Sequence, residues 1–335
     1  MNKLIYYCEM ARKALSLKIL PKSLNYLKYR LYKQKPVVKH YTPQIVGLMT
    51  TQKCNLRCGY CGLAREGILE GKSEMTIEFI RSAFSHPLLK NAILVDLLGG
   101  EPLLCNDIVE IVAFLSFRGY LINTSTNGLL LAEKIVKLKE AGITRINVSI
   151  YPENIDILKN TLKSINSVFK VHTSYVLTRS QLEKNTKEIL EVIEMSRSSG
   201  CKSHRFWMFR PQGRNPNFNE VITEDLPAYR SFKSQIENNY KNYVLWPVAI
   251  SAPKNITGGG KCRQLWQRTG IGTDGKISIC CGNMPPLSSV NIFTSNLDEI
   301  YNHPFVIELR KDLLDKTKKV PSICQTCNLL NETGW

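Results

Sequence analysis

The chain has 335 residues, which suffices for one large domain or two modest ones. Its 43% hydrophobic content supports a sizeable core and excludes wholesale disorder. No apolar run of about eighteen residues occurs and the first residues are charged, so we expect neither a transmembrane span nor a signal peptide but a cytoplasmic protein. The net charge of +17 favours anionic partners without choosing among nucleic acid, lipid, phosphorylated small molecule and acidic peptide.

Residues 1–43 are expected to form a basic, amphipathic N-terminal extension, because residues 1–40 hold ten basic side chains against one acid, Glu9. Apolar side chains recur there at helical spacing in two stretches, the first with Leu4, Cys8, Ala11, Leu15 and Ile19 and the second with Leu24, Leu27 and Leu31. A basic amphipathic helix of this kind binds an anionic membrane surface, which would place the protein peripherally at the inner membrane surface. The alternative is an extension that packs on the main domain with its basic face in water.

Residues 44–215 alternate short apolar runs with helical patterns. The expected strands are Ile45–Met49, Ile93–Leu98, Tyr120–Thr124, Arg145–Ile150, Val171–Thr178 and His204–Phe209. The expected helices lie near 75–89, 106–118, 131–141, 155–168 and 184–199. Successive units of this kind predict an α/β protein with a parallel sheet and right-handed crossovers, either doubly wound or an open barrel. In both architectures the chemistry gathers at the carboxyl ends of the strands.

The remainder of the chain divides into a connecting segment and a cysteine-bearing end. Residues 216–260 are expected to be irregular, because Pro216, Pro247, Pro253 and Gly258–Gly260 interrupt any periodic pattern. The whole chain holds eleven cysteines, seven of which fall into two groups with the spacing of metal ligands. In a large chain without an export signal, clustered thiols hold metal more often than they form disulfides.

The first cysteine group follows the first expected strand directly and reads Cys54-Asn-Leu-Arg-Cys58-Gly-Tyr-Cys61. Three thiolates suit a four-iron cluster whose fourth iron stays open, whereas a structural zinc site, the alternative, needs a fourth ligand from elsewhere. This spacing at a strand end resembles the radical S-adenosylmethionine (SAM) superfamily. The resemblance implies that the open iron binds SAM, and that the reduced 4Fe-4S cluster cleaves it to a 5′-deoxyadenosyl radical, which abstracts hydrogen from the substrate.

A second motif, Gly99-Gly100-Glu101-Pro102, follows the second expected strand and resembles the GGE motif of the same family. The resemblance implies that backbone and carboxylate groups here receive the ammonium group of the methionine. An ammonium has donors and no acceptor, so a carboxylate is a suitable partner. Taken alone, the motif could be a mere turn before a helix.

Further cofactor contacts are implied by the resemblance at later strand ends. Ser125 and Asn127 resemble polar residues that face the cofactor, and Ser149 resembles the serine that contacts the ribose. Tyr60 resembles the aromatic residue beside the adenine, and Arg210 is a candidate contact to a carboxylate or to the substrate. For the two serines and the asparagine, the alternative is ordinary capping of strand ends.

The second cysteine group comprises Cys262, Cys280, Cys324 and Cys327, with an Asp-Gly turn at 274–275 between the first two. It resembles the C-terminal iron–sulfur extension called SPASM, in the shortened form called twitch, because no cysteine follows Cys327. The resemblance implies a small C-terminal module at 261–335 with one fully ligated auxiliary 4Fe-4S cluster, and a partial (β/α)6 TIM-like barrel before it. A four-cysteine zinc site fits the same spacing. Cys281, beside a ligand, is a candidate hydrogen donor to a substrate radical, a spare ligand or buried filler.

These features together predict a radical SAM oxidoreductase that oxidises an unactivated C–H position of an amino sugar, a cyclitol or a ribosomal peptide. The auxiliary cluster would accept an electron, and a donor such as flavodoxin or ferredoxin would reduce the first cluster. One alternative is a redox-neutral epimerase or peptide maturase with a cysteine hydrogen donor. Another is a zinc-bearing nucleic-acid-binding protein, which the charge favours but the sequence does not, since the basic residues lack an RNP or helix-turn-helix pattern.

Overall fold

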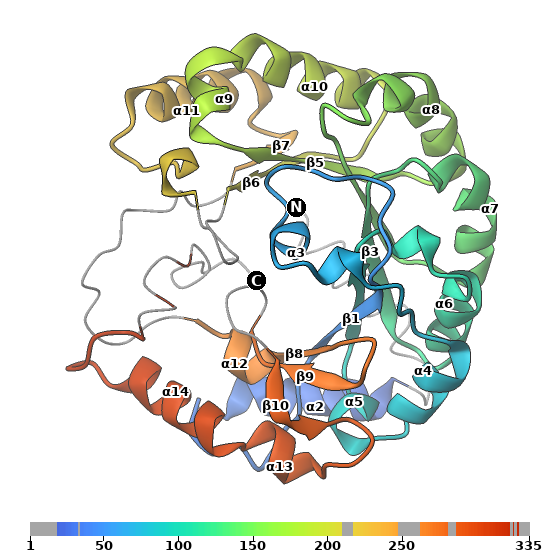
Figure 1. Cartoon of the computed structure of the whole chain (residues 1–335), viewed down its shortest axis with the longest axis vertical. Helices are drawn as coiled ribbons and strands as arrows, with labels where there is room; N and C mark the ends of the chain where they lie inside the picture. The colour runs from blue at the N-terminus through green and yellow to red at the C-terminus, as the bar shows by residue number, and fades with distance from the viewer. Residues whose placement is uncertain are drawn as a thin grey trace.

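The structure is a computed structural model that describes residues 19–32, 34–209, 217–246, 262–280 and 286–321 together with Cys324 and Cys327. Its strands are β1 (Ile45–Thr51), β2 (Leu94–Gly99), β3 (Leu121–Thr126), β4 (Arg145–Ser149), β5 (His172–Leu177), β6 (His204–Met208), β7 (Val244–Leu245), β8 (Arg268–Ile271), β9 (Lys276–Ser278) and β10 (Leu287–Asn291). They form one sheet in the order β10-β9-β8-β1-β2-β3-β4-β5-β6-β7. The sheet curves into an open barrel with helices on its outer face (Figure 1).

The longer helices are α2 (Leu20–Leu31), α4 (Ile77–Ala83), α6 (Ile108–Phe117), α7 (Leu131–Ala141), α8 (Ile155–Val168), α10 (Thr186–Ser198), α11 (Pro227–Tyr240) and α14 (Pro304–Leu314). The shorter ones are α3 (Gly62–Arg65), α5 (Pro87–Lys90), α9 (Arg179–Lys184), α12 (Gln264–Gln267) and α13 (Leu297–Tyr301), with 3-10 turns η1 (Ile68–Glu70), η2 (Pro102–Leu104) and η3 (Phe218–Glu220).

The first six strands pair in parallel and in chain order, with a helix between each neighbouring pair. Their side chains alternate in environment, because successive residues of a strand point to opposite faces of the sheet. Val46 and Leu48 of β1, for example, are fully buried, and so are Ile146 and Val148 of β4. The expected fold class, an α/β partial barrel, is therefore confirmed.

The expectation of an irregular segment at 216–260 is wrong for the part that the structure describes. An apolar stripe in α11 packs against β6, with the Phe232 and Phe206 ring centroids 5.9 Å apart. Strand β7 then pairs in parallel with β6, so the barrel extends past residue 215. The signal was present in the sequence, since Tyr229, Phe232 and Ile236 are spaced as on one face of a helix and are buried.

The C-terminal module continues the core sheet at its other edge. Strand β8 pairs in parallel with β1, with Ile45 opposite Arg268 and Leu48 opposite Ile271. Strand β9 returns antiparallel to β8 through the expected Asp-Gly turn, where Gly275 has a φ of 80° that favours glycine. The module is thus joined to the barrel by backbone hydrogen bonds and does not form a separate layer.

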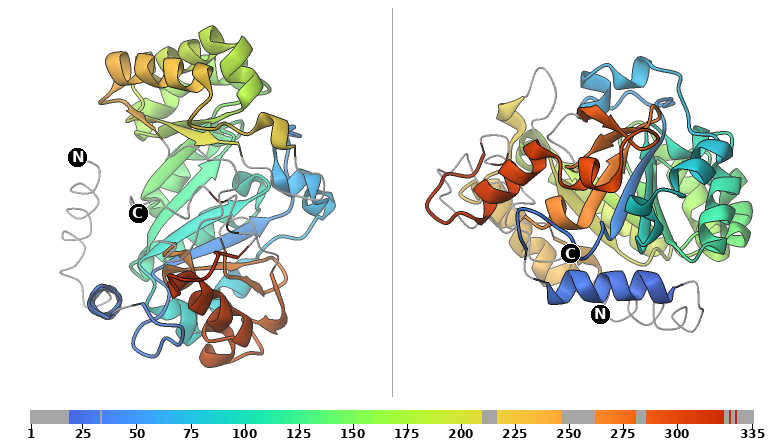
Figure 2. Two further views of the ribbon diagram at one scale, coloured as in Figure 1. Left: turned by 90° about the vertical axis from the view of Figure 1, so that its left-hand side faces the viewer. Right: turned by 90° about the horizontal axis from the view of Figure 1, so that it is seen from below.

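Helix α2 packs with its polar side, contrary to what its sequence pattern suggests. Lys22 is buried, donates from Nζ to the Lys90 carbonyl over 3.1 Å and covers the Tyr120 ring. Asn25 is also buried and donates to the carbonyls of Thr42 and Asn91. The leucine stripe faces outward instead: Leu20, Leu24, Leu27 and Leu31 are 53%, 48%, 50% and 70% exposed. Figure 2 shows α2 at the edge of the molecule, outside the curved sheet.

Helix α2 and the stretch after it are hydrogen-bonded to the C-terminal module. The Tyr29 hydroxyl donates to Gln267 Oε1 over 2.9 Å, and the Trp266 indole donates to the Lys35 carbonyl over 2.8 Å. Arg310, fully buried on α14, donates to the Pro36 carbonyl over 3.2 Å. None of the described helices is both long and apolar enough to cross a membrane.

Candidate iron–sulfur and cofactor site

The first three cysteines lie on a tight loop that begins where β1 ends. Cys61 N–H donates to the Cys58 carbonyl over 3.0 Å, and Cys61 is the cap residue of the short helix α3. The Leu56 N–H points at the Cys54 Sγ over 3.5 Å. All three thiols are partly exposed, so the loop presents them and does not bury them in the core.

The electrostatics of this loop suit a cluster that brings positive charge. Burial raises the pKa of Cys58 to about 12, and the neighbouring Glu153, Cys61 and Cys54 add to the shift. Burial also raises the pKa of Cys54. Without metal, these thiols stay neutral because their ionised forms would repel one another. Thiols lose their protons when they bind iron, and the positive charge of the iron then offsets the repulsion between the thiolates. An iron–sulfur cluster takes each thiolate on a different iron.

The two glycines of the GGEP motif bring the end of β2 against the cysteine loop. Gly100 N–H donates to the Thr51 carbonyl over 2.9 Å. A Cβ at Gly100 would lie 2.2 Å from the Lys53 carbonyl oxygen and 3.0 Å from the Cβ of Cys54. Gly99 has a φ of 144°, and its Cβ would lie 2.4 Å from the Thr51 oxygen. Only glycine fits at either position, so the motif is required by the close approach of two backbones.

Glu101 holds neighbouring strand ends together from within the core. Its carboxylate, 1% exposed, accepts from the N–H groups of Leu103 (3.0 Å) and Asn127 (2.7 Å) and from the Thr126 hydroxyl (2.6 Å). Burial raises the pKa of Glu101, and these hydrogen bonds oppose the rise. Pro102 is buried and begins η2. The expected contact from the Glu101 carboxylate to an ammonium group stays a prediction, since these donors occupy most of its lone pairs.

Three predicted polar residues lie at the carboxyl ends of β3 and β4. Asn127 is buried, and its side-chain amide donates to Asn55 Oδ1, between the first two cysteines, over 2.7 Å. Ser125 is exposed at the end of β3. Ser149, which ends β4, lies 3.3 Å from the Ser174 hydroxyl oxygen. The structure thus gathers the three predicted residues at the carboxyl edge of the sheet, and Asn127 also links that edge to the loop.

Two residues that the sequence analysis missed organise the same edge. Asn154 is 1% exposed, donates to the carbonyls of Asn127 (2.7 Å) and Ser149 (2.9 Å), and accepts from Tyr151 N–H. The Tyr151 ring lies 5.3 Å from that of Tyr60, and burial raises the pKa of both phenols. The available signal was an asparagine three residues after a tyrosine at a strand end, the spacing at which its side chain closes a turn.

The second cysteine group also comes together. Burial raises the pKa of Cys262 to about 11, with Cys327 and Cys280 adding to the shift. The pKa of Cys324 is raised to about 12 by burial, and Cys262, Cys327 and Cys280 add to the shift. Cys327 N–H donates to the Cys324 carbonyl over 3.1 Å. A fully ligated four-iron cluster takes four thiolates, and the ligand role of these four cysteines stays a prediction. Cys281 and Arg210 lie outside the described residues.

The two cysteine groups lie toward opposite ends of β1. Cys54 follows the carboxyl end of this strand. Cys262 precedes α12 and β8, and Cys280 follows the antiparallel β9, so both lie toward the end where β1 begins.

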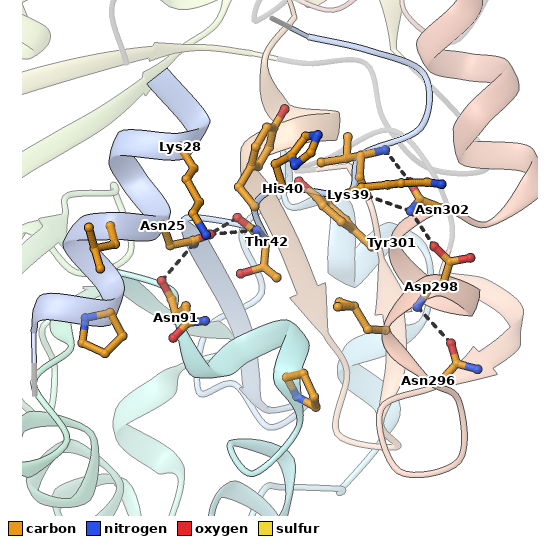
Figure 3. A pocket seen from close by; sticks show the side chains of 16 residues that line it. Asn25, Lys28, Lys39, His40, Thr42, Asn91, Asn296, Asp298, Tyr301 and Asn302 are labelled. Atoms are coloured by element: carbon orange, nitrogen blue, oxygen red, sulfur yellow. Dashed lines mark hydrogen bonds between the residues drawn. The ribbon is translucent and has the colours of Figure 1, made fainter. Parts of the chain in front are cut away.

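A pocket of about 840 Å³ lies on the outside of this arrangement, beside α2 (Figure 3). Leu24, Asn25 and Lys28 of α2 line one side, and Lys39 and His40, which precede β1, line another. Asn296, Asp298 and Asn302 line the side formed by α13 and its flanks. It opens near the start of β1 and is separate from the cysteine loop.

A loop of three thiols at the carboxyl end of a barrel strand, bounded by the polar ends of the following strands, defines an iron–sulfur enzyme on a partial (β/α) barrel. The model of the radical SAM superfamily matches residues 48–221, and that of the SPASM iron–sulfur cluster-binding domain matches residues 262–328. The chain belongs to the radical SAM superfamily and carries a C-terminal SPASM module. These families imply a 4Fe-4S cluster, an auxiliary cluster and SAM, which favours an enzyme over a zinc-bearing nucleic-acid-binding protein.

Proteins similar in sequence to this chain are named for different activities. An AdoMet-dependent heme synthase from Methanosarcina barkeri is 27% identical over 55% of this chain and 55% of its own length, so the chain spans about half of that protein. A probable GTP 3′,8-cyclase from Sulfolobus acidocaldarius is 30% identical over 69% of this chain and 78% of its own length.

Solved structures share the fold. Streptococcus suis SuiB bound to S-adenosylmethionine gives a TM-score of 0.60 at 15% identity, covering 85% of this chain and 77% of that one. The structure of anSMEcpe with bound AdoMet and the Cp18Cys peptide gives 0.56 at 17% identity, covering 86% and 88%.

Proposed function

We propose that this radical SAM enzyme oxidises an unactivated C–H position of its substrate, with a single auxiliary cluster, of the twitch type, as electron acceptor. The observation that carries the proposal is the gathering of Cys262, Cys280, Cys324 and Cys327, which together can ligate every iron of one cluster. A fully ligated cluster has no open iron for substrate, so electron transfer is its simplest role. The substrate would lose one hydrogen atom, then one electron and one proton, which amounts to a two-electron oxidation.

The substrate would be an amino sugar, a cyclitol-type small molecule or a ribosomal peptide. Two structural neighbours were solved with bound peptides, SuiB with the precursor peptide SuiA and anSMEcpe with the Cp18Cys peptide, and they support the peptide class. The named relatives, a heme synthase and a probable GTP cyclase, support a small molecule. SAM, when bound at the cluster of the first cysteine group, would supply the radical, and a small electron carrier such as flavodoxin or ferredoxin would supply the reducing electron.

The rival function is redox-neutral epimerisation or peptide maturation, in which a thiol such as Cys281 returns a hydrogen atom to the substrate radical. Turnover in deuterated water separates the two. The reconstituted enzyme, SAM and a strong reductant are incubated with either the small-molecule fraction or the peptide fraction of the source cells. A product lighter by a pair of hydrogen atoms supports oxidation and identifies the substrate fraction. A product that carries solvent deuterium at an inverted carbon would refute it.

Metal content tests the cluster assignment itself. An anaerobic preparation should be brown and contain about eight irons per chain, as two four-iron clusters require. A colourless protein with one or two zinc ions per chain would contradict both the assignment of iron–sulfur clusters and the proposed oxidation.

We also propose that α2 contacts an anionic membrane surface from the cytoplasmic side. Its exposed leucine stripe is an apolar face that the described residues leave uncovered. Lys28 borders the pocket beside that stripe together with Lys39 and His40, and residues 1–40 add a charge excess of nine. An apolar stripe flanked by cations is the arrangement that binds at the lipid headgroup boundary.

A further inference from the structure

We propose that the pocket beside α2 binds the phosphodiester headgroup of an anionic glycerophospholipid, whose acyl chains leave the pocket along the leucine stripe of the same helix. This inference rests on the proposed contact between α2 and an anionic membrane, to which it adds a defined site for one lipid molecule.

The pocket is preformed and large enough for a headgroup. Its volume of about 840 Å³ falls within the roughly 300–1,000 Å³ of pockets that hold small-molecule ligands. It lies between α2, the segment that precedes β1, and α13 with its flanks, which come from distant parts of the sequence. Hydrogen bonds fix these walls: the Asn25 amide donates to the Thr42 carbonyl over 3.2 Å, and the Asn302 amide donates to the Val38 carbonyl over 2.9 Å.

The lining carries more positive than negative charge. Lys28 lines the pocket on the α2 side, and Lys39 and His40 line it on the side of the segment before β1 (Figure 3). Within the described part of the chain, neither lysine forms an ion pair with a carboxylate. The carboxylate of the described lining, Asp298, lies on the α13 side and accepts from Asn302 Nδ2 over 2.7 Å. Two ammonium groups without a carboxylate partner favour a ligand with a phosphate.

Two hydroxyl groups of the lining lack a hydrogen-bond partner. Tyr41 is 6% exposed and Thr42 is half-buried, and the hydroxyl oxygen of each is buried without a partner among the described residues. Burial raises the pKa of Tyr41 to about 12, so the phenol keeps its proton and remains a donor. Buried hydroxyls are nearly always hydrogen-bonded in native proteins, because an unpaired one costs free energy. A phosphate oxygen in the pocket is a suitable acceptor for both.

The leucine stripe of α2 continues from the edge of the pocket. Leu24 belongs to the stripe, lines the pocket and is 48% exposed. Pro21, one turn earlier on the helix, also lines the pocket and is exposed. A ligand that joins a phosphate to apolar chains would meet cations in the pocket and leucines beside it, as a phospholipid does at the headgroup boundary. A free phosphate compound would leave the leucines uncovered.

The test uses lipids that bind without a membrane. Reconstituted full-length holoenzyme is titrated calorimetrically with dihexanoyl phosphatidylglycerol below its critical micelle concentration. We expect saturable binding of one lipid per chain. Dihexanoyl phosphatidylcholine has the same chains without net charge, and glycerol phosphate has the charge without chains. Each should bind at least about tenfold more weakly, because it lacks one of the two kinds of contact.

Substitutions in the lining test the charge and the hydroxyl separately. Lys28→Gln and Lys39→Gln should each weaken phosphatidylglycerol binding about fivefold, because each removes a cation beside the headgroup. Thr42→Val should also weaken it, while the thermal midpoint stays the same or rises, since this hydroxyl has no partner in the free protein. The matched control is Lys137→Gln on α7, which removes the same charge from an exposed position outside the pocket.

Equal weakening by Lys137→Gln would overturn the site, since net charge alone would then attract the lipid. Equally tight binding of phosphatidylcholine or of glycerol phosphate would overturn it as well, because the ligand would then be recognised by its chains alone or be a free phosphate compound. Absence of saturable phosphatidylglycerol binding would do the same. If Thr42→Val does not fold by circular dichroism, the two lysine variants decide, since both positions are exposed.

Failure of the site and failure of the proposed membrane contact give different results. A protein that sediments with anionic vesicles yet does not bind the short-chain lipid would keep the membrane contact and lose the site. A protein that binds the short-chain lipid yet does not sediment with the vesicles would keep the site and lose the membrane contact.

Discussion

The Asn127 side-chain amide donates to Asn55 Oδ1 over 2.7 Å, which joins the turn after β3 to the cysteine loop after β1. The Asn127 N–H in turn donates to the buried carboxylate of Glu101 after β2. The ends of three strands are therefore connected through one asparagine, and the cysteine loop is held in place by side chains from outside it.

Breaking this bond should weaken cofactor binding. Asn55→Ala and Asn127→Ala each remove one partner, and a net hydrogen bond contributes about 1 kcal/mol, so we expect SAM affinity to fall about fivefold in calorimetry on reconstituted protein. If both act through the same bond, the double variant should bind little worse than Asn127→Ala. Losses that simply multiply would show that the two residues act independently.

The two cysteine groups should separate radical formation from substrate oxidation. Replacing Cys54, Cys58 and Cys61 by alanine should abolish 5′-deoxyadenosine formation under strong reductant, because the SAM-binding cluster is lost. Replacing Cys324 and Cys327 should leave some uncoupled 5′-deoxyadenosine while abolishing product.

Two comparisons make this cysteine experiment interpretable. Cys201→Ala is the matched control, since this buried thiol, which accepts from Asn166, belongs to neither group and should leave the iron content unchanged. Circular dichroism must accompany the assay, because metal binding is coupled to folding. Identical behaviour of the triple and double variants would argue against the division of labour.

The buried lysine of α2 should make stability depend on pH. Burial, aided by Arg118, lowers the pKa of Lys22 to about 7 in the folded protein, against 10.5 for the ordinary group. Between these values the unfolded chain holds a proton that the folded protein lacks, so this group makes stability rise with pH across that window, by up to about 1.4 kcal/mol per pH unit. In Lys22→Met, which keeps the apolar stem, the thermal midpoint should rise less from pH 7.5 to 9.5. Parallel curves for both proteins would show that Lys22 stays charged when buried.

The leucine stripe of α2 should govern membrane binding. Full-length protein should sediment with vesicles of phosphatidylserine and phosphatidylcholine, and salt should release it, because screening weakens surface electrostatics. Leu20→Ser, Leu24→Ser and Leu31→Ser combined should reduce binding by at least tenfold, since each buried leucine contributes about 1.5–3 kcal/mol.

The control for the vesicle experiment removes comparable apolar surface elsewhere. Val136 on α7 and Ile157 on α8 are 50% and 49% exposed, so their replacement by serine should leave sedimentation unchanged. Equal sedimentation with purely neutral vesicles would count against an electrostatic contribution. No sedimentation at all would favour an extension that serves packing only.

Local patterns predicted the barrel well. The six expected strands coincide with β1 to β6 to within a residue or two at most ends, because alternating apolar runs and short turns are properties of the sequence itself. The cysteine loop and the GGEP motif were also recognisable, since their spacing is contained in a few consecutive residues.

Distant contacts account for what the sequence did not predict. The outward leucines of α2 follow from Lys22 and Asn25 finding carbonyls at Lys90 and Asn91, more than sixty residues away. The pairing of β8 with β1 is likewise non-local, and no periodicity in either strand encodes its partner. The contacts of residues such as Asn154 and Asp96 form only when neighbouring strands bring acceptors or cations close to them, so their roles cannot be predicted from local sequence.

The parallel pairing of β1 with β8 has a mechanical consequence. Because β8 of the C-terminal module is hydrogen-bonded along β1, the first strand of the barrel, the module is fixed to the barrel at this edge, and no hinge separates β8 from β1. Under the proposed function, a rigid attachment of this kind would keep the electron path constant through each catalytic cycle. Substrates would then enter and leave by movements of loops and side chains, and not by movement of β8 relative to β1.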